Sequence, residues 1–531
     1  MIVTTCFENW QTWETQDGAI HWRGALYDDA GSRLDPASLI PLGLSDIRDV
    51  VESHYGFFAF IMEKKGSIIA CVDPIRSIPI FYIDDVVISD SAEHVRTCRP
   101  AAAMDAEARA EFLLAGYVTG NRALWSDIKQ LCAGEIAVFS GGGVNRQRYI
   151  EFDHRSVAAL SHEEFRSRLD RVLDHMFRRL IAHAGGRQIV VPLSGGYDSR
   201  LVVTMLKKLG YTNVLCFSYG VDGNEESAVS KSVAEVLGFP WIFVPYRNED
   251  WRRSWRSDSA ASYRSFASGS CSLPHMQDWL AVEKLGAERK IESDCIFVPG
   301  HAGDFIEGGY ITENFLHPLN LSKNRIIDFI IASHFSAAPS RARAEMARLR
   351  RRLSDALGDG PFCSEADAAN AYERWVWEER QAKYTANSLR VYDHFKIDWW
   401  MPLWDQQFIH YWNAVPLELR IERRFAVGYI EALYRTVAGS ADPAPRVDLQ
   451  RRRPGLRYTL KLAVPRWKSQ AISRLLQKRR LRATYKRIEN HPLGFASLVP
   501  RERLRPLVRE GYNVIGIYSK LYLEGSWGDL R

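Results

Sequence analysis

The fold is decided by the stretch Val191-Pro-Leu-Ser194-Gly195-Gly196-Tyr197-Asp198-Ser199-Arg200, in which an apolar run passes through Ser-Gly-Gly directly into a helix-type pattern. The glycines allow a tight turn and a close approach to an anion, and the following helix presents unpaired N–H groups. Ser194 and Ser199 add hydroxyl donors, whereas Asp198 would repel a phosphate unless it held Mg²⁺ against it. The alternative is a plain turn in which Ser and Asp cap the helix. The complete pattern behind a buried strand favours a phosphate-binding loop.

An alternation of strands and helices surrounds this loop. Continuous apolar strands are predicted at 188–193, 213–218 and 241–245, with helices at 200–209 and 225–237 between them. Apolar strands without polar alternation, joined by helices, indicate a doubly wound parallel sheet that is covered on both faces. The sequence therefore predicts an α/β domain with the phosphate-binding loop at the carboxyl end of its first strand.

Composition divides the chain into three parts. Residues 1–150 hold short β-type runs, turn residues and one helix near 105–114, which predicts a β-rich α+β sandwich domain. A capping box, Ser161-His-Glu-Glu164, opens the second part, 160–440, whose later half is mostly helical. The third part, 441–531, is predicted to be a basic helical extension.

Overall composition excludes several classes of protein. The 531 residues are 46% hydrophobic and 25% charged, which indicates a globular protein and excludes dominant disorder. The net charge of +6 is too small a bias to indicate a partner. No apolar run reaches the ~18 residues of a membrane span and the start does not resemble a signal peptide, so a cytoplasmic protein is predicted. The eight scattered cysteines form no CxxC pair, which predicts free thiols.

The SGGYDS stretch resembles the PP-loop ATP pyrophosphatases, and specifically the asparagine synthetase superfamily. Further segments resemble that superfamily in the same order along the chain. They are Gly56-Phe-Phe-Ala-Phe60, Asp73-Pro-Ile-Arg76 to Tyr82, Leu131-Cys-Ala-Gly134-Glu135 with Arg148-Tyr149, Gly300-His-Ala-Gly-Asp304-Phe-Ile-Glu-Gly308-Gly309-Tyr310, and Pro402-Leu-Trp-Asp405 with Asp398.

This resemblance implies a two-step reaction. A substrate carboxylate attacks the α-phosphorus of ATP, and ammonia or an amine then displaces AMP from the acyl-adenylate. Asp198 and Asp304 would hold Mg²⁺, and His301 would deprotonate the amine, unless it is a structural histidine of the loop. The residues implied in binding ATP and pyrophosphate are Leu193, Ser194, Gly195, Gly196, Asp198, Ser199, Ser218 and Gly300.

Three departures limit the resemblance. Ile2 stands where glutamine-using relatives expose a cysteine, and Cys6 reads better as a buried strand thiol, so the first domain is predicted to be a degenerate, Ntn-like glutamine amidotransferase domain. His301 replaces a family glutamate. The family lysine near the end of the synthetase domain is missing, and Arg424 or Lys461 is the candidate replacement.

These departures indicate that the site for the substrate acid differs from that of asparagine synthetases, so several substrates are compatible with the sequence. The leading hypothesis is amidation of a sugar uronate for a surface polysaccharide, with nitrogen from ammonia, an amine or a separate glutaminase. The alternatives are a natural-product cyclase or ligase of β-lactam synthetase or lasso-peptide type, and ammonia-dependent asparagine synthesis. A catalytically dead binding protein is disfavoured, because Ser194, Asp198 and Asp304 are intact.

The basic zone 446–490 holds fifteen Lys and Arg against two acids. Apolar residues from Leu460 to Leu476 recur at three- and four-residue steps, which predicts a basic amphipathic helix interrupted at Pro465. Such a helix either packs on the synthetase domain or contacts anionic lipid at the inner membrane face, and sedimentation with anionic vesicles distinguishes the two. No nucleic-acid reader module is present, so no nucleic-acid partner is expected.

Overall fold

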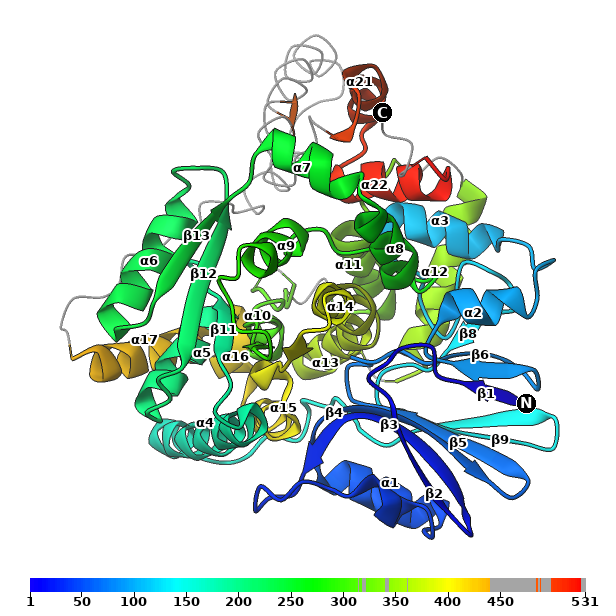
Figure 1. Cartoon of the computed structure of the whole chain (residues 1–531), viewed down its shortest axis with the longest axis horizontal. Helices are drawn as coiled ribbons and strands as arrows, with labels where there is room; N and C mark the ends of the chain where they lie inside the picture. The colour runs from blue at the N-terminus through cyan, green and yellow to red at the C-terminus, as the bar shows by residue number, and fades with distance from the viewer. Residues whose placement is uncertain are drawn as a thin grey trace.

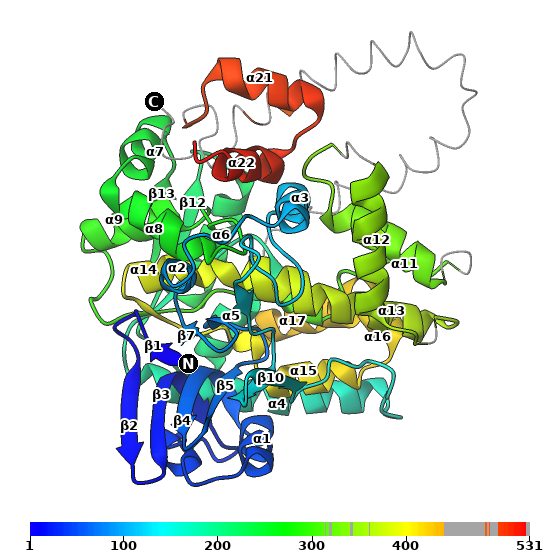
Figure 2. The same ribbon diagram turned by 90° about the vertical axis from the view of Figure 1, so that its right-hand side faces the viewer.

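The computed structural model describes residues 1–313, 315–317, 321–339, 343–360, 362–439, 484–485, 488 and 498–526. A β-rich N-terminal part lies against a larger α/β part (Figures 1 and 2). Within these ranges, no helix combines the length and apolar character needed to cross a bilayer. All eight cysteines are free, as predicted, and five of them are buried.

Two sheets form the N-terminal part. The larger is antiparallel, in the order β10-β9-β5-β4-β3-β2, and the smaller has the order β1-β7-β6-β8. They pack face to face, since the rings of Tyr82 and Phe139 lie 5.1 Å apart between centroids. The bounds are β1 (Ile2–Thr4), β2 (Gln11–Thr15), β3 (Gly18–Tyr27), β4 (Tyr55–Lys64), β5 (Ser67–Val72), β6 (Phe81–Ile83), β7 (Val87–Ser89), β8 (Lys129–Gln130), β9 (Glu135–Ser140) and β10 (Gly143–Arg148).

Three helices accompany these sheets. Helix α1 (Leu44–Ser53) covers the larger sheet and buries Ile47 and Val51, and α2 (Ala92–Thr97) follows β7 (Figure 1). The predicted helix near 105–114 is α3 (Ala106–Ala115), capped by Asp105. The apolar run 78–84, one of the short β-type runs, forms a strand only over β6, because Pro79 has no N–H to donate to a neighbouring strand.

The second part is built on five parallel strands in the order β13-β12-β11-β14-β15. This order confirms the doubly wound sheet. Successive strands are added on one side of β11 up to β13 and on its other side from β14 onward, and ligands bind in such folds at this switch in strand order. The bounds are β11 (Ile189–Pro192), β12 (Val214–Gly220), β13 (Trp241–Pro245), β14 (Ile296–Phe297) and β15 (Asp398–Trp399).

Helices cover both faces of this sheet (Figure 1). Helix α4 (His162–Ala184) begins with the predicted capping box, and α5 (Tyr197–Lys208) and α6 (Glu225–Leu237) lie on the same side. On the other side lie α9 (Trp279–Ala287) and α14 (Arg390–His394). Helix α5 begins three residues before the predicted Arg200, because Gly196 serves as its N-cap, and Asp198 therefore lies in its first turn.

The remaining helices extend the α/β part. They are α7 (Asn248–Trp255), α8 (Asp258–Ser268), α10 (Gly303–Ile306), α11 (Lys323–His334), α12 (Arg343–Leu357), α13 (Glu365–Trp375), the π-helix η3 (Val376–Thr385), α15 (Gln406–Asn413), α16 (Leu417–Arg420), α17 (Arg424–Ala438), α21 (Arg501–Glu510) and α22 (Val514–Leu523). The C-terminal helix α22 packs beside α3, with Phe112 and Tyr522 5.1 Å apart. The predicted basic amphipathic helix and Lys461 lie outside the described residues.

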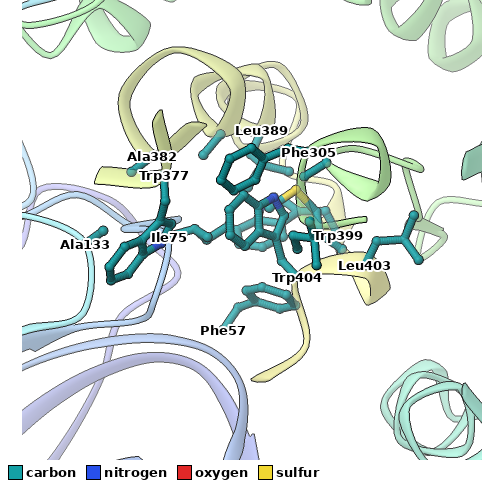
Figure 3. Packing of buried hydrophobic residues seen from close by; sticks show 14 of the residues in the cluster. Phe57, Ile75, Ala133, Phe305, Trp377, Ala382, Leu389, Trp399, Leu403 and Trp404 are labelled. Atoms are coloured by element: carbon teal, nitrogen blue, oxygen red, sulfur yellow. The ribbon is translucent and has the colours of Figure 1, made fainter. Parts of the chain in front are cut away.

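An aromatic core joins the two parts and fixes the short helix α10. Figure 3 shows Phe57 from the N-terminal sheet facing Trp399 and Trp404, with Phe305 of α10 in the same cluster. The rings of Phe305 and Trp404 lie 5.9 Å apart. Because protein cores are close-packed, this contact holds α10 in one place relative to the sheet. Trp377 Nε1 also donates a hydrogen bond of 2.7 Å to the Pro74 carbonyl, which links the α/β part to the N-terminal part.

Candidate active site

The predicted phosphate-binding loop lies at the carboxyl end of β11. Leu193 anchors it to β12 by donating its N–H to the Phe217 carbonyl at 2.8 Å. Ser199 Oγ accepts the Ser194 N–H at 3.0 Å, and the two serine hydroxyls lie 3.1 Å apart. Gly196 in turn donates its N–H to Ser194 Oγ at 3.1 Å. The loop is thus folded over the start of α5, where the positive end of the helix dipole and its first N–H groups favour an anion.

Two glycines let the loop after β14 reach the same point. A Cβ at Gly300 would lie 2.5 Å from Ser199 N, and one at Gly303 would lie 2.8 Å from Asp198 Cγ. Only glycine tolerates such close approach. As a result, Asp304 donates its backbone N–H to Asp198 Oδ2 at 2.9 Å. The backbone of Asp304 and the carboxylate of Asp198, the two residues that the resemblance pairs, therefore meet at the reversal of strand order.

Backbone strain marks this turn. Ala302 has φ of +76°, a left-handed conformation that costs a residue with a side chain about 1–3 kcal/mol. It immediately precedes α10 and directs that short helix toward the start of α5. Strain of this kind persists where the surrounding packing demands it, and it accompanies functional sites.

Arg423 is the cation of the site, and sequence reasoning did not assign it. Its guanidinium forms ion pairs with Asp198 and with Glu307, donating from Nε to Glu307 Oε2 at 2.8 Å. The side chain of the predicted Arg424 is exposed instead, and it pairs with Glu313 at the surface. Left-handed backbone at Glu422 and Arg423, with φ of +54° and +62°, turns the chain so that the two adjacent arginines diverge.

The glycine pair before Tyr310 makes room for this arrangement. A Cβ at Gly308 would lie 2.5 Å from the Arg420 carbonyl oxygen, and one at Gly309 would lie 2.9 Å from Arg423 Cδ. In the sequence, the signal for this ion-pair site was the pair Gly308 and Gly309 beside Glu307, together with the adjacent arginines at 423 and 424. Which arginine is used depends on the strained turn, which sequence alone does not reveal.

Electrostatics show that negative charge is concentrated here. Desolvation by the packed surroundings and the neighbouring Asp198 raise the pKa of Asp304 to about 6, although the residue is exposed to solvent and Arg423 opposes the shift. Burial also raises the pKa of Glu307 to about 8, again against the effect of Arg423. Burial disfavours the charge of Arg423, but Asp198, Glu307 and Asp304 outweigh it, so its pKa is raised. One guanidinium therefore faces three carboxyl groups.

This charge balance fits a divalent cation. Asp198 and Asp304 supply the hard oxygen donors that Mg²⁺ takes when phosphate oxygens complete its coordination. Within the described ranges, no group of three or more His, Cys, Asp or Glu side chains is arranged as a self-sufficient metal site. The two carboxylates thus suit a metal that is held jointly with a nucleotide.

His301 lies beside Gly300 in the same loop and is half-buried. Its Nδ1 lies 3.2 Å from Ser388 Oγ, and burial lowers the pKa of its imidazole. Burial likewise lowers the pKa of His275 to about 4. His301 is therefore neutral at physiological pH and able to accept a proton. Ser218, also named from the sequence, is buried on the adjacent strand β12.

Two acids of the family-like segment near 400 lie elsewhere. Asp398 begins β15, at the opposite end of the strands, where its carboxylate pairs with His183 at 3.0 Å and Arg187 at 2.9 Å. Asp405 caps α15 and pairs with the buried Arg179 at 2.7 Å. Both have structural partners.

The raised pKa of Asp304 gives a stability prediction. The folded protein keeps this proton to about pH 6, whereas the unfolded chain loses it near pH 4. Folded Asp304 therefore binds more protons in that interval, and its contribution to the free energy of unfolding falls as pH rises. Asp304→Asn, which is always neutral, should gain stability relative to the unsubstituted protein as pH rises from 4 to 7 without Mg²⁺, and solvent screening at this exposed position keeps the gain below the full value of the shift. Urea unfolding of both proteins across this range measures the difference, and a constant difference would contradict the raised pKa.

Sequence comparison with known proteins finds one family and one relative that match this chain. The family described as asparagine synthase matches residues 169–465, which is more than half of the chain. A probable glutamine-hydrolysing asparagine synthetase of Acanthamoeba polyphaga mimivirus is 35% identical over 77 residues. That match covers only 14% of this chain and 14% of the viral protein.

Two solved structures are similar to parts of the chain. One is the allosteric regulatory enzyme of purine biosynthesis, at 13% identity over 44% of this chain and 46% of that chain, with a TM-score of 0.18. The other is the glutamine phosphoribosylpyrophosphate amidotransferase from B. subtilis with ADP and GMP, at 11% identity over 55% and 63%, with a TM-score of 0.17. Scores this low carry no argument about the fold.

Proposed function

The chain is an asparagine-synthetase-like member of the asparagine synthase family, and from this premise we propose that it is an ATP-dependent, AMP-forming ligase that makes an amide bond. A substrate carboxylate oxygen attacks the α-phosphorus, and the bond to pyrophosphate breaks. Ammonia or an amine then attacks the acyl carbon of the adenylate, loses a proton and expels AMP. The observation that carries the proposal is the meeting of the Ser194–Ser199 loop with Asp198 and Asp304 at the reversal of strand order.

The loop and Arg423 would act on the leaving pyrophosphate. The N–H groups of Gly195 and Gly196 and the hydroxyls of Ser194 and Ser199 offer donors to its oxygens. Mg²⁺, held by Asp198 and Asp304, would supply charge neutralisation when bound. Arg423 contributes fixed positive charge beside the same carboxylates, where charge builds up on the leaving group.

His301 would accept the proton of the attacking nitrogen. It is half-buried, its pKa is lowered so that it is neutral, and Ser388 lies within hydrogen-bond distance of its Nδ1, which together suit a general base. We place the adenine near Leu193, Ser218 and Gly300, since these residues follow or end adjacent strands at the carboxyl edge of the sheet.

The N-terminal part supports a nitrogen source other than glutamine. The prediction that Cys6 is a buried strand thiol is wrong, because the residue lies beyond the end of β1 at Thr4 and is exposed. Partial desolvation and the nearby Asp90 still raise the pKa of its thiol, so a reactive thiolate is disfavoured. Its backbone N–H is also occupied, donating to Asp90 Oδ1 at 2.7 Å. We propose that this part is a degenerate amidotransferase domain, and that ammonia, an amine substrate or a separate glutaminase supplies nitrogen.

The leading acceptor is a sugar uronate destined for a surface polysaccharide. A natural-product cyclase or ligase of β-lactam synthetase or lasso-peptide type is the alternative, and ammonia-dependent asparagine synthesis is the third candidate. The protein would work in the cytoplasm, with or without a peripheral membrane contact through its basic zone.

Product analysis tests this function. The protein is incubated with ATP, Mg²⁺, ammonia and a panel of acids that includes free uronates and L-aspartate. AMP and pyrophosphate are expected as products, together with acid-dependent ATP–pyrophosphate exchange. ADP and phosphate would contradict the proposal. In a second arm, glutamine should not replace ammonia, and glutamine hydrolysis that disappears in Cys6→Ala would overturn the degenerate-domain assignment.

A further inference from the structure

A cavity of about 400 Å³ is lined in part by Gly309 and Tyr310, which follow Asp304 and Glu307 in the chain. Its walls come from α3, α11, α13 and η3, and the segment around Asn513 closes it. Asn513 is fixed there by donating its N–H to the Ala337 carbonyl at 2.9 Å. The volume is within the range of small-ligand sites.

One wall of this cavity is shared with the active site. Gly309 and Tyr310 line it, and Gly309 has no side chain to separate the two spaces. A Cβ at Gly309 would lie 2.5 Å from the Asp304 carbonyl oxygen and 2.9 Å from Arg423 Cδ. A ligand in the cavity would therefore lie next to the segment that carries Asp304.

Arg380 is the charged group of the cavity. Its guanidinium lies over the Tyr384 ring, 3.9 Å from the centroid, and among the described residues no carboxylate forms an ion pair with it. The neighbouring Glu378 and Glu379 are paired with Arg148 and Lys383 instead. Arg380 belongs to the π-helix η3, an element that is rare and accompanies functional sites.

The other lining side chains are aromatic, neutral and polar, or aliphatic, the last being Ala115, Ala337 and Ile515. Tyr310 and His334 stack with rings 8° from parallel, and Phe329 meets Tyr372 at 5.2 Å. Burial and the charge of Arg380 lower the pKa of His334 to about 3, so this ring is neutral. Ser333, Ser336 and Asn513 add hydroxyl and amide groups.

The lining in the described part of the chain contains no Asp or Glu. An amino-acid substrate would bring an ammonium group into this space without an anionic partner, which is costly in a buried site. A polyhydroxylated acid has no such group. Its carboxylate matches a guanidinium, its hydroxyls match serine and asparagine, and the C–H face of its ring matches aromatic side chains.

We propose that this cavity binds the acid that is to be adenylated, that this acid is a hexuronate-like sugar acid rather than an amino acid, and that Arg380 recognises its carboxylate. The inference rests on the proposed function, because it names the acceptor of that same site. Arg380 thereby determines specificity by holding the carboxylate beside the Asp304 segment before the reaction.

Direct binding measurements test this assignment without turnover. Isothermal titration with D-glucuronate, D-galacturonate and L-aspartate is carried out on the full chain, alongside titration with Mg·ATP. At least one hexuronate should bind, and L-aspartate should not. Arg380→Gln should weaken hexuronate binding about 10–100-fold and leave Mg·ATP binding unchanged, because it removes one charge-assisted contact.

Controls separate specificity from misfolding and from failure of the ligase proposal. Arg374→Gln removes an arginine of α13 outside the cavity, which donates to the Leu357 carbonyl, and should bind hexuronate normally. Arg380→Lys should restore part of the affinity. Binding of L-aspartate, absence of binding by either hexuronate, or equal binding by Arg380→Gln would each overturn the inference. ADP formation in the product assay would instead refute the ligase proposal while leaving these binding results intact.

Discussion

Asp198→Asn should lower the rate of ATP–pyrophosphate exchange about 100–1000-fold. The substitution keeps the size of the side chain, and an amide oxygen can still accept the Asp304 N–H that Asp198 Oδ2 accepts. It removes the negative charge that faces Arg423 and that would help to hold Mg²⁺ against the phosphates. The loss should therefore appear in the rate and in the Mg²⁺ requirement, with the fold retained. Asp304→Asn should behave in the same way.

A matched control is Asp46→Asn, which neutralises an exposed acid in the first turn of α1. Exchange in this variant should stay within about twofold, because exposed surface substitutions have small effects. Circular dichroism of all three variants checks folding. A near-normal exchange rate in Asp198→Asn or in Asp304→Asn would remove that residue from the metal site.

Arg423→Gln and Arg424→Gln should differ sharply although the residues are adjacent. Arg423 pairs with Asp198 and Glu307 inside the cluster, so its loss leaves buried carboxylates without their compensating charge. Exchange should fall about 100-fold or more. Arg424 pairs with Glu313 at the surface, and exposed ion pairs contribute little, so Arg424→Gln should be close to normal.

Arg423→Lys distinguishes the two ways in which Arg423 could act. If positive charge alone matters, lysine should recover much of the rate, whereas a need for the two-pronged guanidinium leaves the rate low. Activity is compared at saturating ATP and Mg²⁺, with urea unfolding as a check of stability. Equal rates in Arg423→Gln and Arg424→Gln would contradict the assignment of Arg423 to the pyrophosphate side.

Local sequence determined the framework of the synthetase part. The structure places α6 at Glu225–Leu237 and β13 at Trp241–Pro245, the bounds that the pattern predicts. The capping box at Ser161 and Glu164 also forms as predicted. These features depend on neighbours in the chain, such as a cap with its third residue or a continuous apolar run, and the sequence displays such neighbours directly.

The sequence predicted a doubly wound parallel sheet, but it predicted neither the order of the strands nor the short strands β14 and β15. Unalternating strands joined by helices allow few arrangements, because crossover connections are right-handed and ligands bind where strand order reverses. Asp198 and Asp304 follow two such strands, β11 and β14, which lie side by side in the sheet. The resemblance to the asparagine synthetase superfamily implied this pair, and the structure brings the two residues together.

Only the tertiary structure decided which arginine completes the site. Arg423 and Asp198 are 225 positions apart, and their contact depends on the left-handed turn at 422–423 and on the missing side chain of Gly309. The same holds for the raised pKa of Asp304 and for the cavity at Arg380, since burial and charge come from segments distant in sequence. A sequence shows the interactions between neighbours, whereas desolvation and the divergence of two adjacent side chains are set when remote segments pack together.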